Sequence, residues 1–123
     1  MIGYVTLGTN DLDRAEKFYD ALLAEVGGKR IMSNERMRFY GSGPGKPMIA
    51  ICKPFDGKRA TGGNGTMVAL AADSKEAVDR IHKKAISLGA SDEGAPGKRG
   101  ENFYGGYFRD ADGNKFVAFV MGK

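Results

Sequence analysis

The chain of 123 residues is 41% hydrophobic and 28% charged, which is the size and composition of one folded domain without a membrane-spanning segment. The N-terminus lacks the basic start and apolar core of a signal peptide, and Cys52 is the only cysteine, so we expect a cytoplasmic protein without disulfides. The net charge is +4, but the cations are scattered among acidic residues, so nucleic acid is not an expected partner.

The first half of the chain predicts a strand, a helix and three further strands. Residues 2–9 form the first strand, and Asn10-Asp11 supplies a helix cap. Apolar residues then recur at helical spacing from Leu12 to Val26, and Gly27-Gly28 ends that helix. Short strands separated by turn residues are predicted at about 28–33, 36–41 and 47–53.

The second half repeats the pattern after a polar linker at 54–63. A strand at about 65–72 leads to a helix that we expect Asp73 to cap, with Glu76 completing a capping box. Gly89 ends the helix, and the segment Gly94–Gly100 is predicted to be a flexible connection, with a mobile lid as the alternative. The remaining strands are predicted near 90–93, 102–109 and 114–121.

The chain is therefore predicted to contain two tandem β-α-β-β-β modules, at about 1–53 and 64–123. This organisation resembles the vicinal oxygen chelate superfamily of glyoxalases, bleomycin resistance proteins and extradiol dioxygenases, with the resemblance carried by Tyr4–Leu12, Phe18-Tyr19 and Arg109–Lys115. It implies an α+β fold in which two modules form a curved mixed sheet around a cleft, with the helices on the outer face, and a homodimer. Two further stretches resemble a small bacterial glyoxalase-like subgroup, namely Lys53–Gly57 and Gly63–Thr66.

The resemblance also implies where a metal would lie. Metal-using members carry four ligands, typically His, Gln or Glu, on the first and last strand of each module. Matched by pattern, those positions are Tyr4, Ala50, Met67 and Val117. Alanine and valine donate nothing to a divalent ion, methionine is a poor ligand for a hard ion, and a neutral tyrosine is a weak one. We therefore expect no metal and no cofactor, and without that electrophile the usual glyoxalase reaction is disfavoured.

The strand periodicity indicates which residues line the cleft. If Tyr4 faces inward, alternate residues of its strand and of the neighbouring strands face inward too, and this set is mostly apolar. We expect these residues to form a small-molecule pocket, with a cleft packed shut by small residues and methionines as the alternative. Two tyrosines near the C-terminus are candidates for the rim, with ordinary strand positions as the alternative. The predicted ligand-binding residues are Tyr4, Thr6, Ala50, Cys52, Met67, Ala69, Tyr104, Tyr107, Val117 and Phe119.

Three functions are compatible with this pattern. The favoured one is a metal-free protein that binds a small organic molecule, apolar or weakly acidic, the acidic character being favoured by Arg109. The second is a lyase or isomerase of the glyoxalase type, in which Tyr4 transfers a proton. The third is a drug-sequestering resistance protein, which the +4 charge disfavours for a cationic drug such as bleomycin. A Cys52–His82 catalytic pair is not expected, because the helices lie on the outer face.

Overall fold

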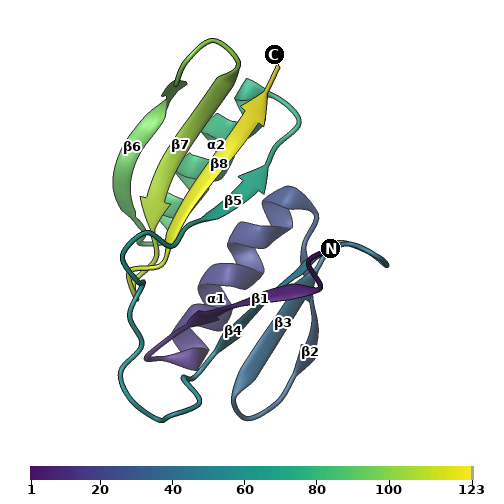
Figure 1. Cartoon of the computed structure of the whole chain (residues 1–123), viewed down its shortest axis with the longest axis vertical. Helices are drawn as coiled ribbons and strands as arrows, with labels where there is room; N and C mark the ends of the chain where they lie inside the picture. Colours follow the sequence, from purple (N-terminus) through teal and green to yellow (C-terminus); the bar gives the residue numbers. More distant parts are fainter. Residues whose placement is uncertain (123) are drawn as a thin grey trace. The chain divides into compact units, whose positions relative to one another are not determined.

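The chain folds into two compact units in a computed structural model that describes residues 1–122. Unit 1 is Met1–Gly62, and unit 2 begins at Gly63. Each unit contains one β-α-β-β-β sequence in which a four-stranded mixed sheet carries one helix (Figure 1). The predicted α+β fold class is confirmed. Within the described residues, neither α-helix is long and apolar enough to cross a lipid bilayer.

Unit 1 has the strand order β1-β4-β3-β2. Strands β1 and β4 run parallel, because the chain returns to the sheet after the helix, and the other neighbours are antiparallel. Its elements are β1 (Tyr4–Gly8), α1 (Leu12–Leu23), the 3-10 turn η1 (Ala24–Val26), β2 (Lys29–Ser33), β3 (Met37–Gly41) and β4 (Met48–Cys52).

Local sequence signals explain both ends of α1. The Asp11 carboxylate accepts a hydrogen bond of 3.0 Å from the backbone N–H of Arg14, which satisfies an otherwise free donor of the first turn. At the other end, Ala24 is the C-cap of α1 and the chain continues as η1, which stops where Gly27 adopts a left-handed φ of 78° and its N–H donates to the carbonyl of Ala24. Between these ends, the apolar stripe buries Leu12, Ala15, Tyr19, Leu22 and Leu23.

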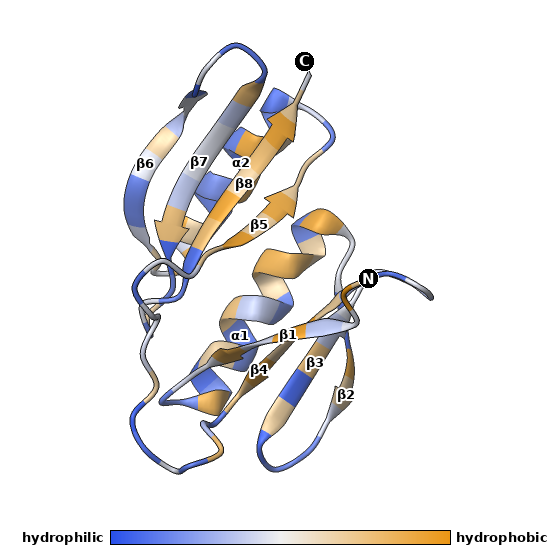
Figure 2. Cartoon of the chain, viewed as in Figure 1, coloured by the Kyte–Doolittle hydropathy of each residue, from blue (hydrophilic) through white to orange (hydrophobic). Residues whose placement is uncertain are grey.

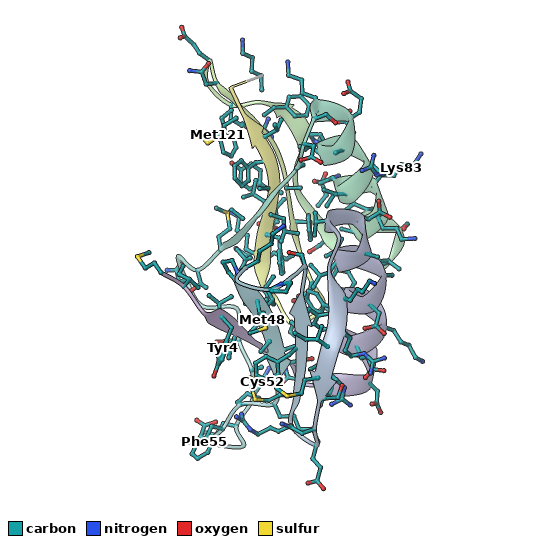
Figure 3. The ribbon with its side chains drawn as sticks, turned by 90° about the vertical axis from the view of Figure 1, so that its right-hand side faces the viewer. Tyr4, Met48, Cys52, Phe55, Lys83 and Met121 are labelled. Atoms are coloured by element: carbon teal, nitrogen blue, oxygen red, sulfur yellow. The ribbon has the colours of Figure 1, made fainter. Side chains whose placement is uncertain are left out.

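One face of the unit 1 sheet packs on α1. The hydroxyl of Tyr40 donates to the carboxylate of Asp20 at 2.8 Å, and Ile51 is fully buried in the same layer. Because side chains alternate along a strand, the intervening residues point away from α1. Figure 3 shows Tyr4, Met48 and Cys52 on this second face of the sheet.

The polar segment 54–62 has a defined place in unit 1. Ala60 is buried, its backbone N–H donates to the side-chain oxygen of Asn10 at 2.8 Å, and the amide of Asn10 donates back to its carbonyl at 3.2 Å. Gly8 makes this approach possible, since a Cβ at that position would lie 3.0 Å from the Cβ of Ala60. The segment is therefore held against the end of β1.

Unit 2 has the corresponding strand order β5-β8-β7-β6, with β5 and β8 parallel. Figure 2 shows that β8 is hydrophobic along most of its length, as expected for a strand at the centre of a sheet. The elements of this unit are β5 (Val68–Ala71), α2 (Lys75–Ser87), β6 (Ser91–Lys98), β7 (Phe103–Arg109) and β8 (Lys115–Met121).

Two local predictions for unit 2 are wrong. The N-cap of α2 is Ser74 rather than Asp73, because Ser74 has the extended backbone of a cap and its hydroxyl accepts from Ala77 N–H at 3.1 Å. The segment predicted as a flexible connection lies mostly in β6, which pairs with β7 through Gly94 and Gly97 despite two register shifts. Glycine signals a turn in isolation, but pairing with a neighbouring strand overrides that preference.

The core of unit 2 lies between α2 and its sheet. Val78, Ile81 and Ala85 of α2 are fully buried, and Phe108 stacks on Phe116 with ring centroids 5.4 Å apart. His82 belongs to this layer, where its Nε2 lies 3.1 Å from both the carboxylate of Asp92 and the backbone carbonyl of Tyr107. The histidine therefore has a structural role at the helix–sheet boundary.

Candidate functional site

The face of the unit 1 sheet that points away from α1 is apolar and rich in methionine. We call it the methionine face. Its strand residues include a phenol, a hydroxyl and a thiol but neither a carboxylate nor an imidazole. It consists of Tyr4, Thr6, Ile31, Met32, Met37, Phe39, Met48, Ala50 and Cys52.

Several residues of the methionine face are accessible to solvent. Tyr4 is 50% exposed, Ile31 58% and Met32 55%, whereas Phe39 is buried beneath them. The rings of Tyr4 and Phe39 meet edge to face with centroids 5.2 Å apart, which fixes the orientation of the phenol. Large exposed apolar side chains grouped on one face typically mark a surface that binds something.

A bulge in β2 builds part of this face. The register between β2 and β3 shifts between Arg30 and Met32, so Ile31 is an extra residue in its strand. Ile31 lies over Gly41, where a Cβ would come within 3.3 Å of its Cδ1 and within 3.2 Å of Met48 Cγ. The missing side chain of Gly41 thus lets Ile31 and Met48 approach each other.

The four positions matched to the family's metal ligands do not fit a divalent ion. In unit 1, Thr6 pairs with Ala50, which makes Tyr4 and Ala50 diagonal neighbours on one face. In unit 2, Val117 pairs with Ala69, and Met67 immediately precedes β5. Ala50 and Val117 are buried, at 0% and 1% exposure, and carry no donor atom. Within residues 1–122, no three His, Cys, Asp or Glu side chains are grouped so as to hold a metal.

The face of the unit 2 sheet that points away from α2 carries both aromatic and cationic side chains. Tyr107, Val117 and Phe119 lie on it, because β7 and β8 pair Tyr107 with Val117 and Gly105 with Phe119. Phe103 stacks on Phe119 with centroids 5.4 Å apart and nearly parallel planes, and we call this pair the aromatic platform. Met121, on the same face, is 60% exposed and points away from α2 (Figure 3).

Next to the aromatic platform lies a group that we call the cationic cluster, formed by Arg99, Tyr107, Arg109 and Lys115. The guanidinium of Arg99 lies 5.6 Å from the ring centroid of Tyr107, and the ammonium of Lys115 lies 5.5 Å from the same centroid. Arg109 pairs with Glu93 at 3.1 Å and donates to the carbonyl of Gly113. The cluster therefore places two cations over the ring of one tyrosine, with Arg109 two residues further along β7.

The two tyrosines predicted for the rim lie on opposite faces of β7. Tyr104 faces α2, where its hydroxyl donates to the carboxylate of Asp79 at 2.6 Å and the ammonium of Lys75 lies 5.7 Å from its ring. This hydrogen bond to a carboxylate raises the pKa of Tyr104. Tyr104 is therefore separated from the other predicted site residues, because positions three apart in a strand have opposite directions.

The remaining predicted residues fall into two groups, one in each unit. Tyr4, Thr6, Ala50 and Cys52 share the methionine face of unit 1. The unit 2 group comprises Met67, Ala69, Tyr107, Val117 and Phe119. Residues of β2 and β3 also line the methionine face but are not among the predicted site residues. The alternation of the apolar residues Met37 and Phe39 could have predicted that β3 contributes to this face. The positions of Ile31 and Met32 depend on a bulge in β2, which the local sequence does not predict.

Comparison with known proteins agrees with this architecture. The model of the Glyoxalase/Bleomycin resistance protein/Dioxygenase superfamily matches residues 1–118, and no curated protein matches the chain significantly. A glyoxalase/bleomycin resistance protein from Albidiferax ferrireducens is 39% identical, with 97% of each chain covered and a TM-score of 0.87.

Two more distant structures show the same fold. One is a glyoxalase/bleomycin resistance protein/dioxygenase family enzyme from Burkholderia phytofirmans, 24% identical over 95% of each chain, with a TM-score of 0.77. The other is a lactoylglutathione lyase from Agrobacterium tumefaciens, 22% identical over 97% of this chain and 92% of that one, with a TM-score of 0.72. The repeated sheet-and-helix unit defines a protein of the vicinal oxygen chelate type. The chain belongs to the Glyoxalase/Bleomycin resistance protein/Dioxygenase superfamily.

Proposed function

We propose that this protein is a metal-free member of its superfamily that binds a small organic molecule. The observation that carries the proposal is the methionine face, where an accessible apolar surface surrounds Tyr4 and Ala50, two of the positions at which related enzymes hold a metal. Methionine side chains are flexible and polarizable, so Met32 and Met48 suit a surface that adapts to an organic ligand.

A metal-free state follows from the side chains at those positions. Tyr4, Ala50, Met67 and Val117 offer one neutral phenol, one thioether and two hydrocarbon side chains. Tight sites for Ni²⁺, Zn²⁺ or Fe²⁺ in proteins are built from imidazole, carboxylate or thiolate donors. The purified protein should therefore contain less than roughly a tenth of an equivalent of Ni, Zn, Fe or Mn by mass spectrometry. A stoichiometric, tightly bound ion would overturn the proposal.

Ligand binding has a direct test with the neutral apolar dye Nile red. We expect the dye to bind the full chain, and the double substitution Met32→Gln and Met48→Gln to weaken binding by about tenfold, because polar side chains remove the apolar contact. The matched control is Ile86→Gln, which changes an exposed apolar residue on α2. Equal weakening by the control, or no effect of the double substitution, would contradict the proposal.

The glyoxalase-type lyase is the second candidate, since the Tyr4 phenol is half exposed on the methionine face. Against it stands the lack, among the strand residues of that face, of a carboxylate or imidazole that could accept its proton. Turnover of a glutathione hemithioacetal that is abolished by Tyr4→Phe would place this candidate first. Calorimetry with bleomycin tests the drug-sequestering alternative, for which no binding is expected.

The proposal also covers the cellular location and the partners of the protein. The lone Cys52 is consistent with the reducing cytoplasm. The family resemblance favours a homodimer, which sedimentation would test. Neither nucleic acid nor a membrane is a proposed partner.

A further inference from the structure

The cationic cluster of unit 2 has the features of a built site rather than a chance grouping. The ring of Tyr107 is contacted by Arg99 and Lys115, which precede and follow β7 in the chain and whose charged groups lie 5.6 and 5.5 Å from its centroid. Cation–π contacts of this kind hold long, flexible side chains in a defined position. The three side chains together present a guanidinium, an ammonium and a phenol to one region of the sheet.

Glycines in β6 make room for the guanidinium. A Cβ at Gly97 would lie 2.8 Å from Nη1 of Arg99, and one at Gly94 would lie 3.3 Å from Nη2. Arg99 also donates to the carbonyl of Ala95 at 2.8 Å, so its side chain folds back over the strand. The side chain, although exposed to solvent, is thereby held over the sheet.

The cluster carries more positive than negative charge. Arg109 and Lys115 are directly opposite each other on β7 and β8, an arrangement that destabilises a sheet unless an anion compensates it. Glu93 compensates Arg109, with an N–O distance of 3.1 Å. Within residues 1–122, neither Arg99 nor Lys115 has a carboxylate within ion-pairing distance. Two cations therefore remain for an external anion.

The aromatic platform adjoins the cluster on the same face. Phe103 covers Gly105, where a Cβ would lie 2.8 Å from its ring, and stacks on Phe119. Phe119 lies opposite Gly105, which is two residues from Tyr107 along β7, or about 7 Å at the usual strand rise. A ligand with its anionic group at Tyr107 can therefore place an apolar body against Phe119, the nearer ring of the platform.

We propose that unit 2 contains a binding site for a small organic oxyanion, a carboxylate or phosphate joined to an apolar body. Arg99, Lys115 and the Tyr107 hydroxyl donate to the oxyanion, and the Phe103–Phe119 platform holds the apolar part. This inference rests on the proposed small-molecule function and specifies the chemistry of its ligand. Charge-assisted hydrogen bonds from a guanidinium and an ammonium supply the preference for an anion.

Calorimetry with matched probes tests the site in the full chain. The probes are 4-phenylbutyrate, its neutral analogue 4-phenylbutyramide, and phenyl phosphate. We expect at least one oxyanion to bind about tenfold or more tightly than the amide, with the preference falling as salt rises. Amide NMR shifts should cluster in β6, β7 and β8.

Variants then locate the preference. Arg99→Gln and Lys115→Gln should each remove most of the affinity difference between the oxyanion and the amide. Gly97→Ala keeps the charge of Arg99 but should reduce this difference, because the new Cβ displaces the guanidinium. Lys83→Gln, on the exposed side of α2 (Figure 3), should change nothing. Equal affinity for the acid and the amide, or a preference that survives the Arg99 and Lys115 variants, overturns the site. Nile red distinguishes loss of the oxyanion site from failure of the proposed function. If only the oxyanion site is wrong, the neutral dye still binds, whereas if the small-molecule function is wrong, the dye does not bind either.

Discussion

Removing the Tyr40 hydroxyl tests how burial affects the contribution of a hydrogen bond to the unfolding free energy. Tyr40 is 2% exposed in unit 1, and its hydroxyl donates to the Asp20 carboxylate at 2.8 Å. Tyr104 makes the same bond to Asp79 at 2.6 Å in unit 2, where the tyrosine is only half buried. Tyr40→Phe and Tyr104→Phe therefore delete the same chemical contact in two environments.

The expected losses of unfolding free energy differ. A hydrogen bond to a charged group contributes about 1.5–3 kcal/mol. Asp20 is partly exposed and keeps two contacts of 3.2 Å from Arg30, so it is not left unsatisfied when Tyr40 changes. We therefore expect Tyr40→Phe to cost about 1–2 kcal/mol, and Tyr104→Phe less than about 0.5 kcal/mol, because water replaces the lost contact.

The pH dependence of this effect has a definite sign. Burial, and then the hydrogen bond to Asp20, raise the pKa of Tyr40 in the folded state. Because tyrosine in an unfolded chain ionises near pH ~10, ionisation favours unfolding above that pH. The stabilisation by Tyr40 is fully present below pH ~10 and is lost as the pH rises further. The difference between wild type and Tyr40→Phe should therefore shrink in strong alkali.

Urea unfolding followed by far-UV circular dichroism measures these differences. With a denaturant slope of ~1.5 kcal/mol/M, a loss of about 1–2 kcal/mol lowers the midpoint by about 0.7–1.3 M for Tyr40→Phe. The Tyr104→Phe midpoint should move by less than about 0.4 M. Equal shifts for the two variants, or a difference that grows between pH 9 and 11, would refute the reasoning.

Three further predictions follow from local contacts. Gly106→Ala should cost about 1–3 kcal/mol in a thermal melt, because the new Cβ would lie 3.1 Å from the ring of His82. Ser74→Ala should lower unfolding free energy by about 1 kcal/mol in urea, whereas Asp73→Ala should change it by less than about 0.5 kcal/mol. The backbone N–H of Gly94, and then His82, lower the pKa of Asp92, so the stabilisation is present above pH ~4 and is lost in acid. Acid unfolding of Asp92→Asn should therefore show a shallower dependence on pH.

Strand alternation was sufficient to predict which residues face the helices. With Tyr4 placed on the inward face, alternation assigns Leu7, Ile51 and Phe116 to the helix-facing layer, and all three are buried. Tyr4 was expected on the other face and lies there. A period of two assigns each side chain to a face once one residue is placed, so these predictions needed no knowledge of the tertiary contacts.

Contacts between residues far apart in sequence were not predictable in the same way. The arginine at position 99 was placed in a flexible segment, yet it lies over Tyr107 because β6 pairs with β7 and its glycines leave room. Ile31 reaches the methionine face only because β2 contains a bulge. Both features depend on strand registers that local sequence does not specify.

The order of the residues alone thus determined the duplicated sheet-and-helix unit and the side-chain chemistry at the four positions matched to the family's metal ligands, because periodicity and side-chain type are properties of the chain itself. The pairing of strands decided which cations meet which aromatic ring. The separation of Tyr104 from Tyr107 follows instead from alternation along β7, because residues three apart face opposite sides of the sheet. The physical reason is that hydrophobic alternation depends only on residues next to each other in the chain. A group of side chains that converge from several strands depends also on the strand register, on bulges and on glycines that leave room for them.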